Sequence, residues 1–223
     1  MSHQTTAGQP TMIDEARTAE RAGAESVRAE IRMGAGELTI AGGAARLLEA
    51  AFSYNVPDWR PELDYAVRDG QGLLTVRQPE GQGKGATRNA RQHWGLRFAD
   101  GVPLDLRVQV GAVTALLTVG DLALDALAIE TGAGNLTLDL AGARGPLAVT
   151  IKGGVINATI RLPTATGAQV AVRAPVATID APSLRRAGHT YSNDAHTTAD
   201  EAVRVTISGG VASIKLQTGE SSR

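Results

Sequence analysis

The feature that most constrains the fold is a strand pattern that recurs about every 21 residues around a glycine. Apolar and polar residues alternate on both sides of each glycine, and a period of two is typical of β-strands. The copies centre on Gly34-Ala35-Gly36, Gly111, Gly132, Gly154 and Gly209-Gly210, with a less regular copy that starts at Val170. One such unit cannot bury its own apolar face, so the copies are expected to stack on one another.

The repeat predicts an all-β fold, a β-solenoid with rungs of about 21 residues. The glycines are expected at corners of the chain, or where neighbouring rungs approach too closely for a Cβ atom. Asn135 and Asn157 fall at nearly equivalent positions of successive rungs, so they are expected to form a short asparagine stack. The copy that contains Val203 is expected to be the terminal rung.

Prolines and glycines, which favour turns, divide the chain further. We expect a flexible tail over 1–22, an N-terminal portion rich in β-hairpins over 23–81, a loop over 82–93, the solenoid portion over 94–218 and a short tail over 219–223. Within the N-terminal portion, strands are predicted at 47–54, 64–67 and 73–77.

Composition excludes several classes of protein. Lys and Arg number 22 and Asp and Glu number 23, so the basic excess of a nucleic-acid-binding protein is missing. Aromatic residues make up 3%, which leaves little for base stacking, and the absence of cysteine excludes disulfides and thiolate metal sites. No run of 18 apolar residues occurs and residues 1–10 lack the features of a signal peptide, so the chain is expected to be soluble as given. The compartment is left open, and a soluble part of a cell-envelope protein fits these features.

The segment from His189 to His196 is the first candidate for chemistry. Two histidines with Asp194 could bind zinc, and Ser192 beside His189 could serve as a nucleophile with a base. The spacing matches no known zinc pattern, and no Gly-x-Ser-x-Gly motif is present. We favour a capping loop in which Tyr191 and Asn193 bond exposed backbone at the end of the stack.

Charged side chains within the repeat are the second candidate. Cleavage of a polysaccharide needs acidic groups that converge on one face. Alternation with core residues instead predicts separate, solvated side chains that point outward, and these are Glu130, Asp139, Lys152 and Arg161. The Gly34-x-Gly36 and Gly132-x-Gly134 pairs are interpreted as backbone corners, because neither completes a phosphate-binding motif or opens a helix.

A locally basic segment is the third candidate. It contains Lys84, Arg88, Arg91, His93, Trp94 and Arg97. Such a segment could contact an anionic lipid or a phosphate group. The charges are spread over 14 positions with glycines between them, so we favour a solvated loop.

Several motifs, taken in order, resemble a known bacterial family. The segments 31–40, 52–62 and 73–79 are similar to the N-terminal part of toast-rack proteins, and 102–106 through 132–140 resembles the adhesin-like C-terminal β-domain of LiaF-like proteins. The resemblance covers about residues 25–218. It implies a toast-rack-like domain that is a single sheet or a single-stranded right-handed β-solenoid, without known catalytic residues. It also implies a link to sensing or regulation of cell-envelope stress. The membrane-spanning segments typical of LiaF-like regulators are missing from this sequence.

These observations predict a non-enzymatic, LiaF-like protein-interaction module, for which no catalytic, cofactor-binding or metal-binding residue is named. The expected partner is another protein or a second copy, with no nucleic acid and no small-molecule substrate. The alternative is a self-associating, adhesin-like β-solenoid scaffold. Unpaired strand edges at the ends of a stack would drive such self-association unless the tail before Ser26 and the loop from Arg185 to Asp200 cover them.

Overall fold

The fold was analysed in a computed structural model, which describes residues 11–79, 89–196 and 202–220. Described residues contain strands, turns and one short 3-10 helix, Pro57–Trp59, but no α-helix. The strands are β1 Ile13–Ala19, β2 Ser26–Ala41, β3 Leu48–Tyr54, β4 Glu62–Arg68, β5 Gln71–Arg77, β6 Gln92–Phe98, β7 Leu104–Thr118, β8 Leu124–Asp139, β9 Leu147–Pro163, β10 Ala168–Arg173, β11 Val176–Asp180, β12 Arg185–Ala187, β13 Thr190–Ser192 and β14 Val203–Gly219. The prediction of an all-β protein is confirmed.

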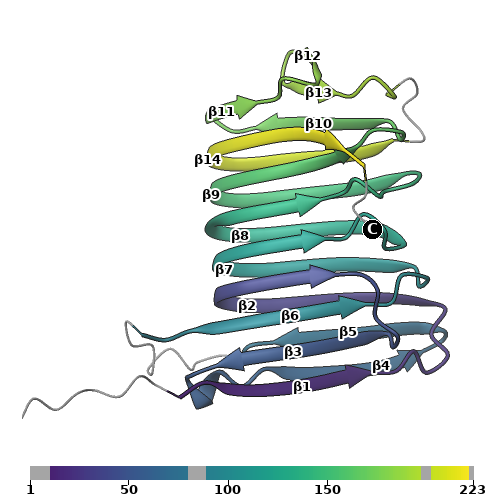
Figure 1. Cartoon of the computed structure of the whole chain (residues 1–223), viewed down its shortest axis with the longest axis vertical. Helices are drawn as coiled ribbons and strands as arrows, with labels where there is room; N and C mark the ends of the chain where they lie inside the picture. The colour runs from purple at the N-terminus through teal and green to yellow at the C-terminus, as the bar shows by residue number, and fades with distance from the viewer. Residues whose placement is uncertain (1–10, 80–88, 197–201, 221–223) are drawn as a thin grey trace, which may run out of the picture.

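Five long strands, β2, β7, β8, β9 and β14, form the body of the molecule. Each bends back on itself near its glycine, and the bends lie along the left side of Figure 1. We call the half before the bend the first arm, the half after it the second arm, and the bend the corner. The arms of successive strands pair in parallel, with Leu106 beside Leu127 and Leu127 beside Val149.

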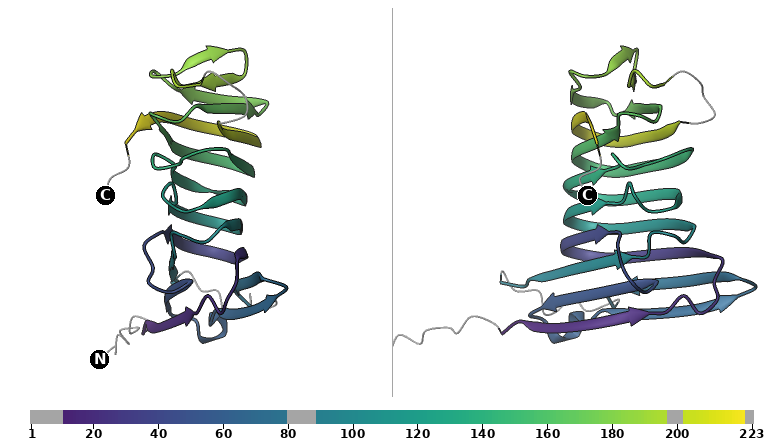
Figure 2. Two further views of the ribbon diagram at one scale, coloured as in Figure 1. Left: turned by 90° about the vertical axis from the view of Figure 1, so that its right-hand side faces the viewer. Right: turned by 45° about the vertical axis from the view of Figure 1, so that its right-hand side comes forward.

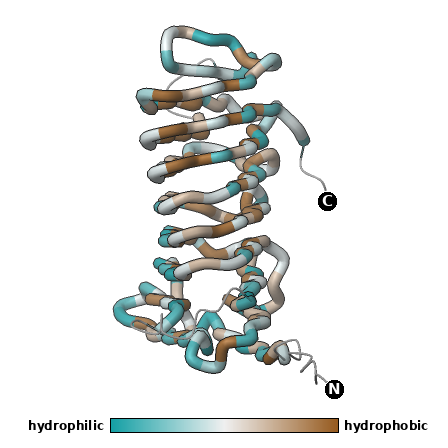
Figure 3. The backbone as a smooth tube through the Cα atoms, turned by 90° about the vertical axis from the view of Figure 1, so that its left-hand side faces the viewer, coloured by the Kyte–Doolittle hydropathy of each residue, from teal (hydrophilic) through white to brown (hydrophobic). Residues whose placement is uncertain are grey.

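One hydrophobic core fills the space between the first and second arms. Buried side chains in β7 alternate with exposed or half-buried ones on each side of the corner, and the alternation restarts after Gly111. The change of phase turns the apolar side chains of both arms toward each other. Figure 3 shows the resulting alternation of hydrophobic and hydrophilic residues along each strand.

The order of the last strands differs from the order in the sequence. Strand β14 lies between β9 and β10, so the copy that starts at Val170 is the last rung and the copy at Val203 is not terminal. Strand β14 runs unbroken for 17 residues and pairs with β9 from Val203 to Gly219. The β10–β11 pair is interrupted at Ala174-Pro175, and proline cannot donate a ladder hydrogen bond. An interrupted rung is tolerated best at the edge of the sheet, where only one side needs a partner.

The N-terminal portion contains the expected hairpin and forms the broad base of the molecule (Figures 1 and 2). Strands β5 and β6 pair with the first and second arms of β2, and β4 pairs antiparallel with β5. Strand β3 pairs antiparallel with β6, and β1 then pairs with β3. All these strands and the body belong to one large 14-stranded sheet.

Two segment boundaries that were predicted from the sequence are wrong. The tail expected over 1–22 contains β1, because Ile13 to Ala19 pair in register with Tyr54 to Leu48. Contacts with β3 rather than a strong apolar pattern make this segment a strand. The loop expected over 82–93 already includes the start of β6 at Gln92, while residues 80–88 lie outside the described part.

Candidate functional site

A column of stacked glycines runs along the corner. Its members are Gly34, Gly111, Gly132, Gly154 and Gly210, which occupy equivalent positions between paired residues of neighbouring strands. A Cβ atom on Gly154 would lie 2.8 Å from the carbonyl oxygen of Gly132, and one on Gly132 would lie 3.0 Å from that of Gly111. Close approach of backbones therefore requires glycine here, and the corner presents bare main chain to the surface.

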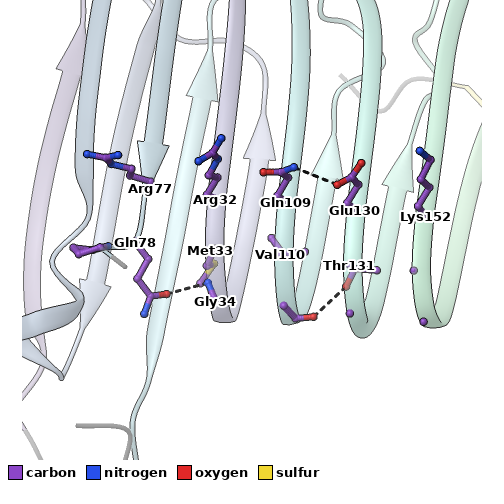
Figure 4. A pocket seen from close by; sticks show the side chains of 15 residues that line it. Arg32, Met33, Gly34, Arg77, Gln78, Gln109, Val110, Glu130, Thr131 and Lys152 are labelled. Carbon is purple, nitrogen blue, oxygen red and sulfur yellow. Dashed lines mark hydrogen bonds between the residues drawn. The ribbon is translucent and has the colours of Figure 1, made fainter. Parts of the chain in front are cut away.

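Polar side chains of the first arms form a ladder beside this column. Arg77, Arg32, Gln109, Glu130 and Lys152 lie in register on β5, β2, β7, β8 and β9. Figure 4 shows these side chains standing in a row above the corner. Together with the glycines they line an open trough of about 810 Å³ that crosses five strands.

Gln78 lines the N-terminal end of the trough and is held there by Gln92. The Nε2 atom of Gln92 donates to the Oε1 atom of Gln78 at 2.8 Å and to the carbonyl oxygen of Ala35 at 2.6 Å. The same Gln78 oxygen accepts a hydrogen bond from the Gly34 amide at 3.0 Å, drawn in Figure 4. Gln78 thereby takes the place that a further corner glycine would have, and Gln92 is only 3% exposed.

The charges of the trough are partly neutralised within the protein. Arg32 pairs with Glu30 at 2.8 Å, and Arg77 pairs with Glu62 at 2.7 Å. Glu130 accepts a hydrogen bond from Gln109 at 3.2 Å. Lys152 is exposed and has no ion pair within 4.0 Å among the described residues. Among its described lining residues, the trough therefore offers one free cation beside exposed main chain, an arrangement suited to binding a polar or acidic chain.

The four charged residues named from the repeat do not converge. Glu130 and Lys152 lie on first arms, whereas Asp139 and Arg161 lie on second arms and form an ion pair of 3.3 Å. The expected asparagine stack is confirmed, since Asn157 Nδ2 donates to Asn135 Oδ1 at 2.8 Å. All these side chains follow the outward direction that the alternation predicts.

The segment 189–196 caps the first arm. Asn193 is 2% exposed, and its Nδ2 donates to the carbonyl oxygens of Pro163 and Thr166 at 2.8 Å each. Its Oδ1 accepts from the Ala168 amide at 2.9 Å, so the role predicted for this side chain is confirmed. Among residues 11–79, 89–196 and 202–220, no three His, Asp or Glu side chains are grouped to hold a metal ion.

The described part of the basic segment does not form the loop that was expected. His93, Trp94 and Arg97 belong to β6 rather than to a loop. Trp94 is fully buried and packs edge-on against Phe52 with ring centroids 5.5 Å apart, so its ring cannot stack on a ligand. Arg97 donates to the carbonyl oxygen of Gly43 at 2.6 Å. Lys84 and Arg88 lie outside the described residues.

A charged cluster at the N-terminal end of the second arms was not anticipated. Arg60 donates two hydrogen bonds of 3.0 Å to the Glu15 carboxylate, and Arg17 donates one of 2.7 Å. These hydrogen bonds lower the pKa of Glu15 from 4.5 to about 2, and the bonds from Arg60 contribute most. Burial raises the pKa of Tyr54, whose hydroxyl lies 3.4 Å from the same carboxylate. Only the pairing of β1 with β3 brings Glu15 near Arg60, so the sequence carries no local signal for it.

Stacked strands folded at a glycine corner define an all-β scaffold protein with regular, ladder-like faces. The chain belongs to the toast-rack family: the model of the N-terminal domain of toast_rack, DUF2154, matches residues 7–161. This confirms the family suggested by the sequence motifs. A search of curated proteins found no match.

Two solved structures are similar to this chain. A cell-adhesion candidate from Clostridium sporogenes ATCC 15579 is 26% identical, with a TM-score of 0.89 over 94% of this chain and 100% of that chain. An adhesin candidate from Bacteroides fragilis NCTC 9343 is 12% identical, with a TM-score of 0.35 over 94% and 100%. In the part of the chain that the structure describes, no helix is long and apolar enough to cross a membrane.

Proposed function

We propose that this protein is a non-enzymatic, LiaF-like protein-interaction module, linked to sensing or regulation of bacterial cell-envelope stress. We further propose that its rungs wind as a right-handed, single-stranded β-solenoid. The observation that carries the functional proposal is the trough, because five strands hold one row of polar side chains in register beside bare main chain. Neighbouring strands lie about 4.8 Å apart, so the row extends for about 20 Å.

The chemistry of the trough supports binding rather than catalysis. Its described lining contains one carboxylate, Glu130, and that group is already hydrogen-bonded to Gln109. Glycoside hydrolysis generally uses two carboxylates across the scissile bond. Lys152 instead provides a charged donor for an extended, acidic segment of a partner protein.

The relatives support a place at the cell envelope. The structure with a TM-score of 0.89 comes from a cell-adhesion candidate, and the family match covers residues 7–161. We propose on this basis that the chain acts as a soluble part of the envelope machinery. Its partner would then be a membrane sensor kinase or another envelope protein.

The alternative is a self-associating, adhesin-like scaffold. One observation favours it: β11 pairs only with β14 and leaves its other edge without a strand among the described residues. Such edges can template pairing between chains.

Crosslinked affinity capture from source cells tests the proposal. The tagged chain, its Lys152→Glu variant and an Arg68→Glu control are compared as baits, with mass spectrometry as the readout. Arg68 is an exposed arginine on β4 that does not line the trough, so the control makes the same charge change away from it. We expect the wild type and the control to recover the same envelope protein, and Lys152→Glu to recover about tenfold less.

Other outcomes contradict the proposal in different ways. Equal recovery of the envelope protein by all three baits would exclude the trough as the binding site. Recovery of only untagged copies of the bait would support the self-associating scaffold instead.

A further inference from the structure

Strand β11 is an open edge of the sheet. It pairs with β14 from Val176 to Asp180, and no described strand pairs with its other side. The terminal cap covers only the first arm, because β13 pairs with β10 and β12 pairs with β13. Figure 1 shows β11 at the upper left, beside this cap. A row of main-chain donors and acceptors is therefore unpaired within the described sheet.

The end of the hydrophobic core is also open at β11. Ala177 and Ile179 lie in register with Ala212 and Ile214, which are 3% and 2% exposed. Ala177 itself is exposed and Ile179 is half-buried, although both occupy inward positions. On the outer surface, Val176 is 61% exposed. One more strand would both cover the open end of the core and pair with the free main-chain donors and acceptors of β11.

Strand β14 shows which chemistry suits a neighbour of β11. It places Ala212 and Ile214 beside the two inward residues of β11, and Lys215 beside Asp180. Apolar residues at alternate positions extend a core, and opposite charges on adjacent strands attract.

We propose that β11 binds an extended strand from a partner protein by strand addition. This strand carries apolar side chains at the positions facing Ala177 and Ile179 and a cationic side chain facing Asp180. The proposal rests on the function proposed above, since it specifies a second contact of the same interaction module. Main-chain hydrogen bonds supply the affinity and the alternate side chains supply the specificity.

A second copy of the chain fits this edge poorly. In a head-to-tail stack, β11 would meet β1, whose inward positions carry the Glu15 and Arg17 charges. Pairing of two β11 edges about a two-fold axis would bring two caps together. Each cap rises two strands above β10, about 10 Å, whereas paired edges lie about 4.8 Å apart. A single extended segment meets neither obstacle.

Binding of a defined peptide to the purified chain tests the proposal. The probe is a peptide of residues 211–217, Val-Ala-Ser-Ile-Lys-Leu-Gln, which is the natural neighbour of β11. Its control carries asparagine in place of Ala212 and Ile214, which keeps the charge and removes the apolar side chains. We expect saturable binding of the probe by NMR, with shifts confined to 176–180 and the adjoining cap, and at least tenfold weaker binding of the control.

Two protein variants locate the edge. Ala177→Lys puts a charge at the inward position, as Arg17 does at the opposite end, while Thr178→Lys puts the same charge on the outward side of the same strand. We expect Ala177→Lys to weaken peptide binding at least tenfold relative to Thr178→Lys. Both side chains are exposed, so both variants should melt within about 2 °C of the wild type.

The remaining outcomes overturn the proposal. These are absence of peptide binding, equal binding by the two variants, or shifts that map to another strand. A dimer in sedimentation that Ala177→Lys dissociates would assign the edge to a second copy. Cellular capture that succeeds with Ala177→Lys, together with absence of peptide binding, would leave the interaction module intact and remove only the β11 site.

Discussion

The two ends of the second-arm sheet differ in the side chains that their edge strands turn toward the core. At the N-terminal end, β1 turns Glu15 and Arg17 inward, and Arg60 completes an ion-pair cluster over the core. At the C-terminal end, β11 turns Ala177 and Ile179 inward and leaves its edge unpaired among the described residues. Inward-pointing charge on an edge strand discourages addition of another strand, and apolar residues permit it. The difference indicates that only one end of this sheet is suited to growth.

The first-arm sheet provides a useful contrast at the C-terminal end. There β10 is covered by β13, and Asn193 fastens the cap to three backbone groups. The same rung is therefore sealed on one arm and open on the other. An edge left open beside a firmly built cap is consistent with a site for a partner.

The largest expected change in stability concerns the glycine column, which runs along the corner from one end of the stack to the other. A Cβ atom on Gly111 would make the closest approach in the glycine column, to the Gly34 carbonyl oxygen, whereas one on Gly210 would lie 3.0 Å from that of Gly154. We expect Gly111→Ala to lower the free energy of unfolding by about 2–3 kcal/mol and Gly210→Ala by about 1 kcal/mol. Urea denaturation measures both.

Gly101→Ala is the control for these variants, because a Cβ atom there would meet nothing within 4 Å. It should change the free energy of unfolding by less than about 0.5 kcal/mol. A Gly111→Ala protein as stable as this control would show that the corner backbones can separate without cost.

The next effect tests how firmly the first arm is sealed. Asn193→Ala removes three side-chain hydrogen bonds in a position that is 2% exposed. Because the main-chain groups left behind are partly shielded from water, we expect a loss of about 2 kcal/mol by thermal or urea unfolding. The neighbour Asp194 is exposed, so Asp194→Ala should cost less than about 0.5 kcal/mol. Equal losses in the two variants would mean that the cap contributes little to the fold.

The smallest expected change in stability tests the N-terminal end of the second-arm sheet, and it depends on pH. Glu15→Gln removes the carboxylate that Arg60 and Arg17 bind, and we expect a loss of about 1–2 kcal/mol at pH 7. The folded state lowers the pKa of Glu15 from 4.5 to about 2, so its stabilisation is complete above pH 4.5 and disappears as the pH falls toward 2.

The difference in urea midpoint between wild type and Glu15→Gln reports this group alone, because other carboxylates titrate in both proteins. We expect the difference to shrink between pH 4.5 and about 2. A difference that is constant with pH would assign the effect to packing rather than to charge. Asp14→Asn serves as the matched control, since Asp14 is exposed on the same strand.

Much of the body of the molecule could be predicted from local patterns. Alternation around Gly111, Gly132 and Gly154 predicted the strands and the stacking, because the period of two and the steric need for glycine are properties of short segments. The asparagine stack followed from the same spacing, and the role of Asn193 followed from its place in a polar loop before the last copy. The trough was only partly foreseen: Glu130 and Lys152 were predicted to point outward, but their alignment with Arg32 and Arg77 was not.

The sequence by itself determined that the chain forms strands, that they fold at glycines and which side chains face the core. Tertiary structure alone decided that β14 lies between β9 and β10, that residues 13–19 join the sheet and that Glu15 meets Arg60. The physical reason is that alternation and close packing act within a few residues, whereas strand order depends on which distant edges pair best. The open edge of β11 was also decided by the tertiary structure. The edge stays unpaired because the cap pairs with β10 rather than with β11.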